Sequence, residues 1–177
     1  DNWYKQNIID NGFEEYISKD YGFCGDRSLH SGDGVSLDNF SYFSFEERIK
    51  NNAFILTCTN PENDLYTVSS ALIGNKALTY PIGLITADEL AFAGMNSTKL
   101  NKISWVYSDY DYATITPSHF NSVGVYSLSA TLSSEGIMSA KRATGAVGYR
   151  PVINLKSNVE ISGGIGTVND PYVIKTN

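Results

Sequence analysis

The chain has 177 residues, of which 42% are hydrophobic and 18% charged, and its formal net charge at pH 7 is -6. This composition is typical of a folded globular protein, and the length predicts one domain over residues 1–177. The negative charge argues against nucleic acid as a partner, because proteins that bind its phosphates carry a basic surface.

The sequence contains no segment that would cross a membrane by itself. None of its apolar runs approaches the roughly 18 residues that a spanning helix needs. The sequence also begins abruptly at Asp1, inside a predicted helix. We therefore expect a domain excised from an exported protein and attached to a membrane or cell wall only through an anchor outside this sequence.

Two helices are predicted in the first half of the chain. Residues 2–18 have the apolar spacing of an amphipathic helix, although a glycine weakens its middle. A second helix is predicted at about 87–93, because Thr86 and Glu89 have the spacing of a capping box. Gly94 is then placed to end this helix.

Most other elements are predicted to be short strands. Residues 20–52 form a polar, glycine-rich region of loops and short strands, and residues 53–58 form a buried strand. From residue 103 onward the pattern is all β, with strands expected at 103–107, 112–116, 123–128, 136–138, 148–155, 159–161 and 172–174. Helices that precede many short strands indicate an α+β fold.

The two cysteines, Cys24 and Cys58, are predicted to form a disulfide. Both lie in strand-like runs, and the surrounding sequence is rich in Tyr, Ser, Asn, Gly and Thr, as in exported proteins. Closing a loop of about 35 residues would contribute roughly 3–4 kcal/mol. Two unrelated buried thiols are the alternative. Neither cysteine has metal-ligand spacing, so we predict no metal site.

Aromatic residues gather between residues 105 and 126, and we predict that they form a ligand-binding surface. Tyrosine and tryptophan offer a rigid contact area with a polar tip, which suits both sugar stacking and protein recognition. In regular strands, Trp105 would share a face with Tyr107, and Tyr110 with Tyr112. Core packing is the alternative, above all for Trp105. The candidate ligand-binding residues are Trp105, Tyr107, Asp109, Tyr110, Asp111, Tyr112 and Tyr126.

Three charged residues have further hypotheses attached. Asp109 and Asp111 could bind a hard cation through their oxygens, but the spacing of a calcium loop is missing, which favours a solvated turn. Arg150 interrupts the apolar segment 148–155, and a covered guanidinium must be paired. We predict that it pairs with Asp88 or Glu89 and fixes the C-terminal strand to its neighbour.

No pattern in the sequence indicates catalysis. The only histidines are His30 and His119, and no Gly-x-Ser-x-Gly motif accompanies them. Both are expected to be solvated residues of loops or strand ends. We therefore predict no catalytic residues, no cofactor and no enzymatic activity.

Several segments, in chain order, resemble a largely uncharacterised surface-protein domain of Gram-positive gut bacteria. They are Trp3-Tyr4-Lys5, Phe23-Cys24-Gly25-Asp26-Arg27-Ser28, residues 78–89, Thr116-Pro117-Ser118, Gly148-Tyr149-Arg150-Pro151-Val152-Ile153-Asn154-Leu155, Gly164-Ile165-Gly166-Thr167 and Pro171-Tyr172-Val173. That family is similar to the major paralogous domain of rumen bacteria and, through it, to C-type-lectin-like folds. The resemblance implies such a fold here, with two helices, a mostly antiparallel twisted sheet and long ligand-binding loops.

The resemblance also implies an extracellular or cell-surface location. We expect a binding or adhesion module that recognises a host or bacterial surface glycan or protein through residues 104–147. The alternative is a pilin-like or cell-surface assembly subunit, and the oligomeric state stays open. The resemblance carries over no catalytic residue, and the Glu-Pro-Asn and Trp-Asn-Asp triplets of calcium-dependent lectins are absent.

Overall fold

The largest sheet combines strands from both halves of the chain. The computed structural model describes residues 1–34, 40–121, 126–142, 145–167 and 169–176. The order of this six-stranded sheet is β2-β3-β5-β6-β7, and β8 pairs with β5 outside that path. The strands are Leu29–Ser31 (β2), Ser41–Phe43 (β3), Tyr112–Asn121 (β5), Tyr126–Leu132 (β6), Met138–Arg142 (β7) and Gly148–Tyr149 (β8).

The central strand β5 determines how the C-terminal part of the chain is placed. Along one edge it pairs antiparallel with β6. Its other edge is shared, because β3 pairs with His119 and Phe120, whereas β8 pairs in parallel with Tyr112 and Ala113. The ladder with β6 shifts register around Pro117, which has no N–H to donate. The segment after β8 therefore leaves the sheet beside the first residues of β5.

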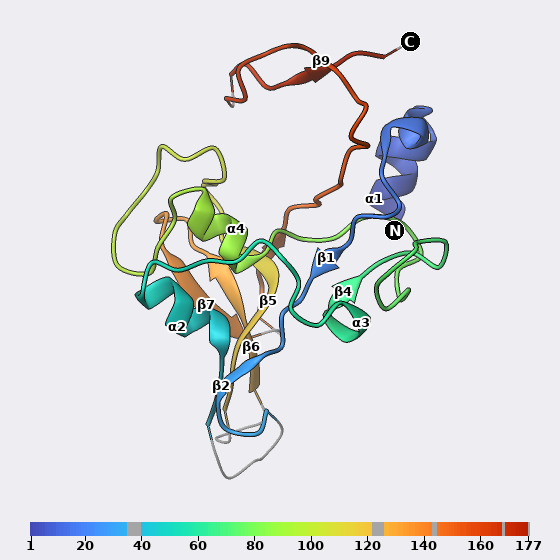
Figure 1. The fold of residues 1–177 in the computed structure, drawn as a ribbon. Coiled ribbons are helices and arrows are strands. Elements are labelled where there is room, and N and C mark those ends of the chain that lie inside the picture. Colours follow the sequence, from blue (N-terminus) through green and yellow to red (C-terminus); the bar gives the residue numbers. More distant parts are fainter. Residues whose placement is uncertain (35–39, 122–125, 143–144, 168, 177) are drawn as a thin grey trace.

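Two small sheets and several short helices surround this sheet (Figure 1). One small sheet pairs β1 (Phe23–Cys24) with β4 (Leu65–Tyr66), and the other pairs β9 (Ile161–Gly163) with β10 (Val173–Ile174). The helices are α1 (Asn2–Tyr4), a π-helix (Lys5–Ile9), a 3-10 helix (Phe13–Tyr16), α2 (Ser44–Lys50), α3 (Pro61–Asp64) and α4 (Ala87–Phe92). The α+β class is therefore confirmed. None of the helices in the described ranges is long and apolar enough to span a bilayer.

The main core lies between the large sheet and helices α2 and α4, which cover it in Figure 1. Phe45 and Ile49 from α2 meet Leu90 from α4 over strand residues such as Tyr112 and Leu132. The capping box predicted for α4 is confirmed. The Glu89 N–H donates to Thr86 Oγ1, and the Thr86 N–H donates to the carboxylate of Glu89. In contrast, α2 lies in a region predicted to be loops and short strands.

The predicted helix over residues 2–18 is wrong in its length. Short α, π and 3-10 turns occupy this region instead, and Gly12 separates the last two with a φ of 73°. The segment still buries an apolar face, because Tyr4, Ile8 and Ile17 form a second core cluster. The ring of Tyr4 stacks on that of Tyr80 at 5.1 Å.

A buried ion network joins α2, α4 and the segment after β1. The guanidinium of Arg48 lies 2.6 Å from Asp26 Oδ2 and 2.6 Å from Asp88 Oδ2. These carboxylates belong to residues that are only 6% and 3% exposed. Burial opposes ionisation of Asp26, but hydrogen bonds from Ser28 and Arg48 outweigh it and lower the pKa of this carboxyl group.

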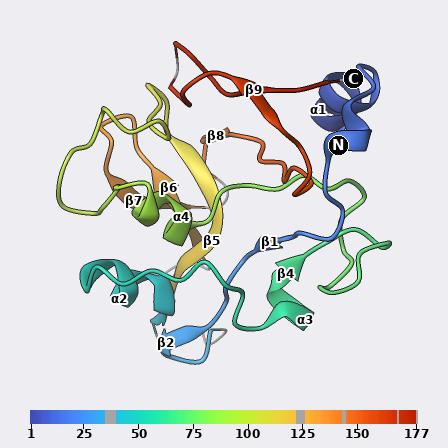
Figure 2. The ribbon, with the colours of Figure 1, turned by 45° about the horizontal axis from the view of Figure 1, so that its top comes forward.

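Two predicted strands do not form. Residues 53–58 pair with no strand among the residues that the structure describes, and residues 103–107 form a bend and a turn. Segment 148–155 is a strand only over β8, after which isolated bridges join Val152 to Gly83 and Leu155 to Ile17. The closing hairpin near the C-terminus is confirmed as β9 and β10. It lies outside the large sheet in both views of the ribbon (Figure 1, Figure 2).

Candidate functional site

Trp105 is 60% exposed, so the alternative that it packs in the core is wrong. It lies in a turn closed by the Tyr107 N–H, which donates to the Ser104 carbonyl at 3.0 Å. The Ser104 hydroxyl in turn donates to the carbonyl of Ala93, directly after α4. The turn therefore holds Trp105 beside the end of α4, and the shared strand face predicted for Trp105 and Tyr107 is wrong.

Tyr110 and Tyr112, two residues apart and predicted to share a strand face, differ strongly in exposure. Tyr112 is 2% exposed, and its hydroxyl donates to the Val106 carbonyl at 2.6 Å. Burial raises the pKa of this hydroxyl, and the nearby cation of Arg150 opposes the rise. Tyr110 is 78% exposed. The backbone of Tyr126 lies in β6, and its side chain is outside the described part.

The two aspartates predicted at this site have separate partners. Asp109 Oδ1 lies 2.8 Å from the Tyr107 hydroxyl, which can also donate to the Ser134 carbonyl. Asp111 accepts from the Ser134 N–H and from the ammonium of Lys141, and the hydrogen bond from Lys141 is the main reason why its pKa is lowered. No group of three or more acidic, histidine or cysteine residues within the described ranges is arranged to hold a metal ion.

A cleft of about 660 Å³ opens beside Trp105. Val106 and Tyr112 are buried and form its base, whereas Trp105 and Leu56 are exposed at its mouth. The remaining lining residues come from the region of α4 and from the segment after β8; they are Ile85, Glu89, Phe92, Ala93, Arg150, Pro151, Val152 and Ile153. Ten of the twelve lining residues are therefore apolar or aromatic, and only Glu89 and Arg150 are charged.

Helix α4 presents a different face to the cleft from the one it buries. Leu90 is fully buried in the core, while Phe92, two residues later, is exposed. Residues two apart point to different sides of an α-helix, so Leu90 can anchor the helix while Phe92 faces the cleft. The exposure of Phe92 could have been inferred from the sequence, because its position in the helix lies off the face that Leu90 buries in the core.

The opposite wall is fixed by backbone hydrogen bonds. Val152 exchanges two of them with Gly83, at 2.9 and 3.0 Å. A side chain at Gly83 would collide with the ring of Phe23, because a Cβ there would lie 2.2 Å from it. The glycine therefore lets Phe23, Gly83 and Val152 pack in one stack behind the cleft.

Arg150 does not make the ion pair predicted for it. Its Nη1 donates to the Val106 carbonyl at 2.6 Å, and its guanidinium carbon lies 5.1 Å from the centre of the Tyr112 ring. Asp88 pairs with Arg48 instead, and Glu89 is hydrogen-bonded to Thr86 in the capping box. The reason is position, because β8 pairs Gly148 and Tyr149 with the start of β5, and the side chain of Arg150, directly after β8, lies over the ring of Tyr112.

Residues 53–58, which we call the strap segment, reach the cleft through Leu56. Phe54 lies edge-on to Phe92 with ring centres 5.3 Å apart, and the Ile55 N–H donates to Asp88 at 3.1 Å. Cys58 ends the segment and forms the predicted disulfide with Cys24. The disulfide prediction is confirmed, and it ties the strap segment to β1.

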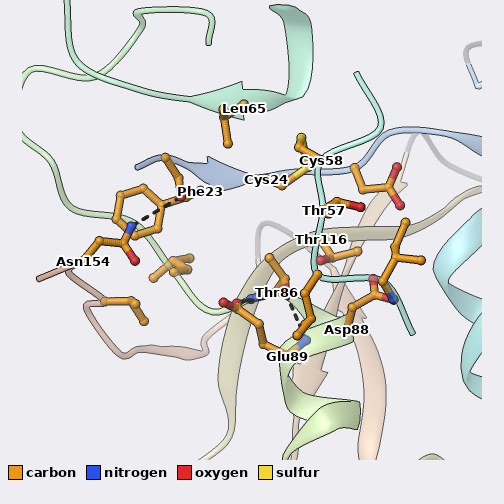
Figure 3. Close-up of a pocket in the computed structure, with 16 residues that line it drawn as sticks. Phe23, Cys24, Thr57, Cys58, Leu65, Thr86, Asp88, Glu89, Thr116 and Asn154 are labelled. Atoms are coloured by element: carbon orange, nitrogen blue, oxygen red, sulfur yellow. Dashed lines mark hydrogen bonds between the residues drawn. A yellow bond between two sulfur atoms is a disulfide. The ribbon is translucent and has the colours of Figure 1, made fainter. Parts of the chain in front are cut away.

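A smaller hollow of about 110 Å³ adjoins the cleft. The two share Leu56, Glu89 and Val152 as lining residues. Figure 3 shows the Cys24–Cys58 disulfide and Thr57 on one side of this hollow and the Thr86–Glu89 capping box on another. The hollow therefore offers polar groups where the cleft offers apolar ones.

One cluster outside the cleft superficially resembles a catalytic triad. Ser118 Oγ lies 2.9 Å from His119 Nδ1, and Glu46 Oε1 lies 3.3 Å from the same nitrogen. A proton relay needs the nucleophile and the carboxylate on different ring nitrogens. Ser118 is also fully buried. This arrangement cannot pass a proton from serine to glutamate through the histidine ring.

No protein-family model matches this chain, and neither the curated proteins nor the solved structures contain a significant match to it.

Proposed function

We propose that this domain is a non-enzymatic binding or adhesion module that recognises a glycan or protein in the Trp105 cleft. The observation that carries this proposal is the exposed indole of Trp105 at the mouth of a concave, mostly apolar cleft. Ligand sites are typically concave, largely apolar and equipped with a few polar groups, which Glu89 and Arg150 supply here.

The proposed setting is the cell surface. A disulfide persists in oxidising compartments, so Cys24–Cys58 supports an extracellular, surface-anchored domain. We further propose a C-type-lectin-like arrangement and membership of the Gram-positive surface-protein family that the sequence resembles. The antiparallel sheet with short helices and long connections is compatible with both.

The experiment is a screen of the purified domain on arrays of glycans and surface proteins, followed by affinity measurements with Trp105→Ala. We expect the variant to lose at least about tenfold in affinity, which corresponds to about 1.4 kcal/mol. Trp3→Ala is the matched control, because Trp3 is also exposed but lies in α1. Equal affinities of Trp105→Ala and wild type would overturn the proposal.

A second candidate, an assembly subunit, is favoured by the β9–β10 hairpin. Its strands pair only with each other among the described residues, and Ile161, Ile165, Tyr172 and Val173 are exposed on it. Two-stranded sheets are marginally stable alone, so burying these side chains against another copy would stabilise it. Concentration-dependent sedimentation that Ile161→Ser abolishes and Trp105→Ala leaves unchanged would support assembly in place of binding.

A further inference from the structure

The lining of the Trp105 cleft favours an apolar side chain over a sugar ring. A bound sugar needs partners for several hydroxyl groups, and leaving them unpartnered in a cleft costs affinity. Here the hydroxyl of Tyr112 already donates to Val106, so few side-chain polar groups remain for such hydroxyls. An aromatic or large aliphatic side chain makes no such demand and would bury against Trp105 and Phe92.

Arg150 adds a fixed positive charge to this apolar surface. The Val106 carbonyl accepts a hydrogen bond from Nη1 of Arg150, and the guanidinium lies over the ring of Tyr112, so the side chain is oriented before any ligand binds. No ion pair of Arg150 with a carboxylate exists within the described ranges, although several other cations of the chain have one. Guanidinium groups bind carboxylates in a fork geometry, and pre-orientation lowers the entropy cost of doing so.

The neighbouring hollow supplies the third feature. Because it shares Leu56, Glu89 and Val152 with the cleft, a chain that leaves the cleft passes directly to the hollow. There, Thr57 and Asn154 offer groups for the peptide backbone (Figure 3). Glu89 accepts the Thr86 N–H and hydroxyl, so its charge is already engaged at this boundary.

We infer that the ligand of the cleft is a protein segment in which an aromatic or large aliphatic side chain lies next to an acidic side chain. The apolar side chain occupies the space between Trp105 and Phe92, and the carboxylate pairs with Arg150. This inference rests on the binding function proposed above and selects protein over glycan as the ligand class.

The test uses small probes and the indole N–H resonance of Trp105, read in a Trp3→Phe background that leaves a single tryptophan. The matched probes are acetyl-Phe-Glu-amide and acetyl-Phe-Gln-amide, which differ only in carrying a carboxylate or an amide. Acetyl-Phe with a free terminal carboxylate and glucuronic acid test the two other sources of the same charge. We expect the Glu probe to saturate the resonance at a concentration about tenfold lower than the Gln probe.

Arg150→Gln should bring the two peptide probes to equal affinity, whereas Lys99→Gln, an exposed cation outside the cleft, should preserve the tenfold difference. The comparison of the two probes on the parent protein stands even if Arg150→Gln folds poorly. Equal binding of both probes to the parent overturns the carboxylate inference and leaves the binding function intact. Saturation by glucuronic acid alone, or by terminal carboxylate alone, also overturns it. If no probe reaches the cleft, the inference fails, and the array screen separately decides the binding function.

Discussion

At the scale of single residues, Arg48 is notable because one guanidinium pairs with two buried carboxylates. Its guanidinium donates hydrogen bonds to Asp26 and Asp88, which lie 22 and 40 residues away in sequence. The sequence could not reveal this pairing, because nothing local links α2 to Asp26 or Asp88. The capping box of Thr86 and Glu89 was predictable for the opposite reason, since its partners are three residues apart.

Arg48→Ala should destabilise the fold strongly. The change leaves Asp26 and Asp88 buried without their cation, and breaking a buried pair typically costs about 3–5 kcal/mol. Denaturant unfolding measures the loss. Lys175→Ala is the control, because its pair with Glu160 is exposed on both sides and should contribute little. A loss no larger than that of the control would show that the network contributes nothing to stability.

The lowered pKa of Asp26 makes part of this stability depend on pH. The carboxyl group ionises more readily in the folded chain than in the unfolded one, so its contribution is present above about pH 4 and fades as the pH falls further. Asp26→Asn should therefore lower the thermal midpoint at pH 7 and flatten its decline between pH 5 and pH 3. Asp10→Asn, an exposed position, should keep the wild-type profile. A wild-type slope in Asp26→Asn would contradict the assignment.

At the scale of elements, the strap segment is the part that sequence patterns describe least well. Its run of apolar residues predicted a buried strand, but Phe54 and Leu56 are exposed. Leu56 lines the cleft, and Phe54 packs against Phe92, which also lines it. A short apolar run has no periodicity that separates a core strand from a binding surface. What holds this segment is the disulfide, the Asp88 contact and the Phe92 ring, and all three are distant in sequence.

Removing the disulfide should therefore affect both stability and ligand binding. Cys24→Ser with Cys58→Ser opens a loop of 34 residues in sequence separation, which corresponds to a loss of roughly 3–4 kcal/mol. Denaturant unfolding would measure this loss. Because Leu56 borders the cleft, the affinity of the variant for its ligand should fall as well. A substitution that only lowers stability should leave this affinity unchanged. Two alkylatable thiols in the unreduced protein, seen by mass spectrometry, would contradict the disulfide itself.

At the scale of the whole molecule, the sequence predicted the class of the fold better than the arrangement of its strands. The α+β class, helix α4 and the β9–β10 hairpin follow from local patterns. The order of the large sheet does not, because β3 and β8 reach the same edge of β5 from distant parts of the chain. That arrangement brings Arg150 to Val106, which is why the predicted pairing of Arg150 with α4 was wrong.

The candidate site shows the same division. Trp105 and Tyr112 were predicted as ligand-binding residues, and both line the cleft. Arg150 also lines it, although it was predicted only as a structural residue. Leu56 and the segment 151–153 were missed as site residues, because only the tertiary fold brings them to Trp105. Phe92 was also missed, although its exposure could have been inferred from its position in the helix. Four other predicted site residues do not line the cleft, namely Tyr107, Asp109, Tyr110 and Asp111. The aromatic surface predicted between residues 105 and 126 is therefore not one continuous site.

The most direct test of the central claim is a map of backbone amide shifts on titration with a ligand selected on the arrays. If the Trp105 cleft is the binding site, the largest shifts fall at three separate segments, 89–93, 105–112 and 150–153, together with the strap segment. Shifts confined to the β9–β10 hairpin or to the surroundings of Ser118, with these segments unchanged, would contradict it.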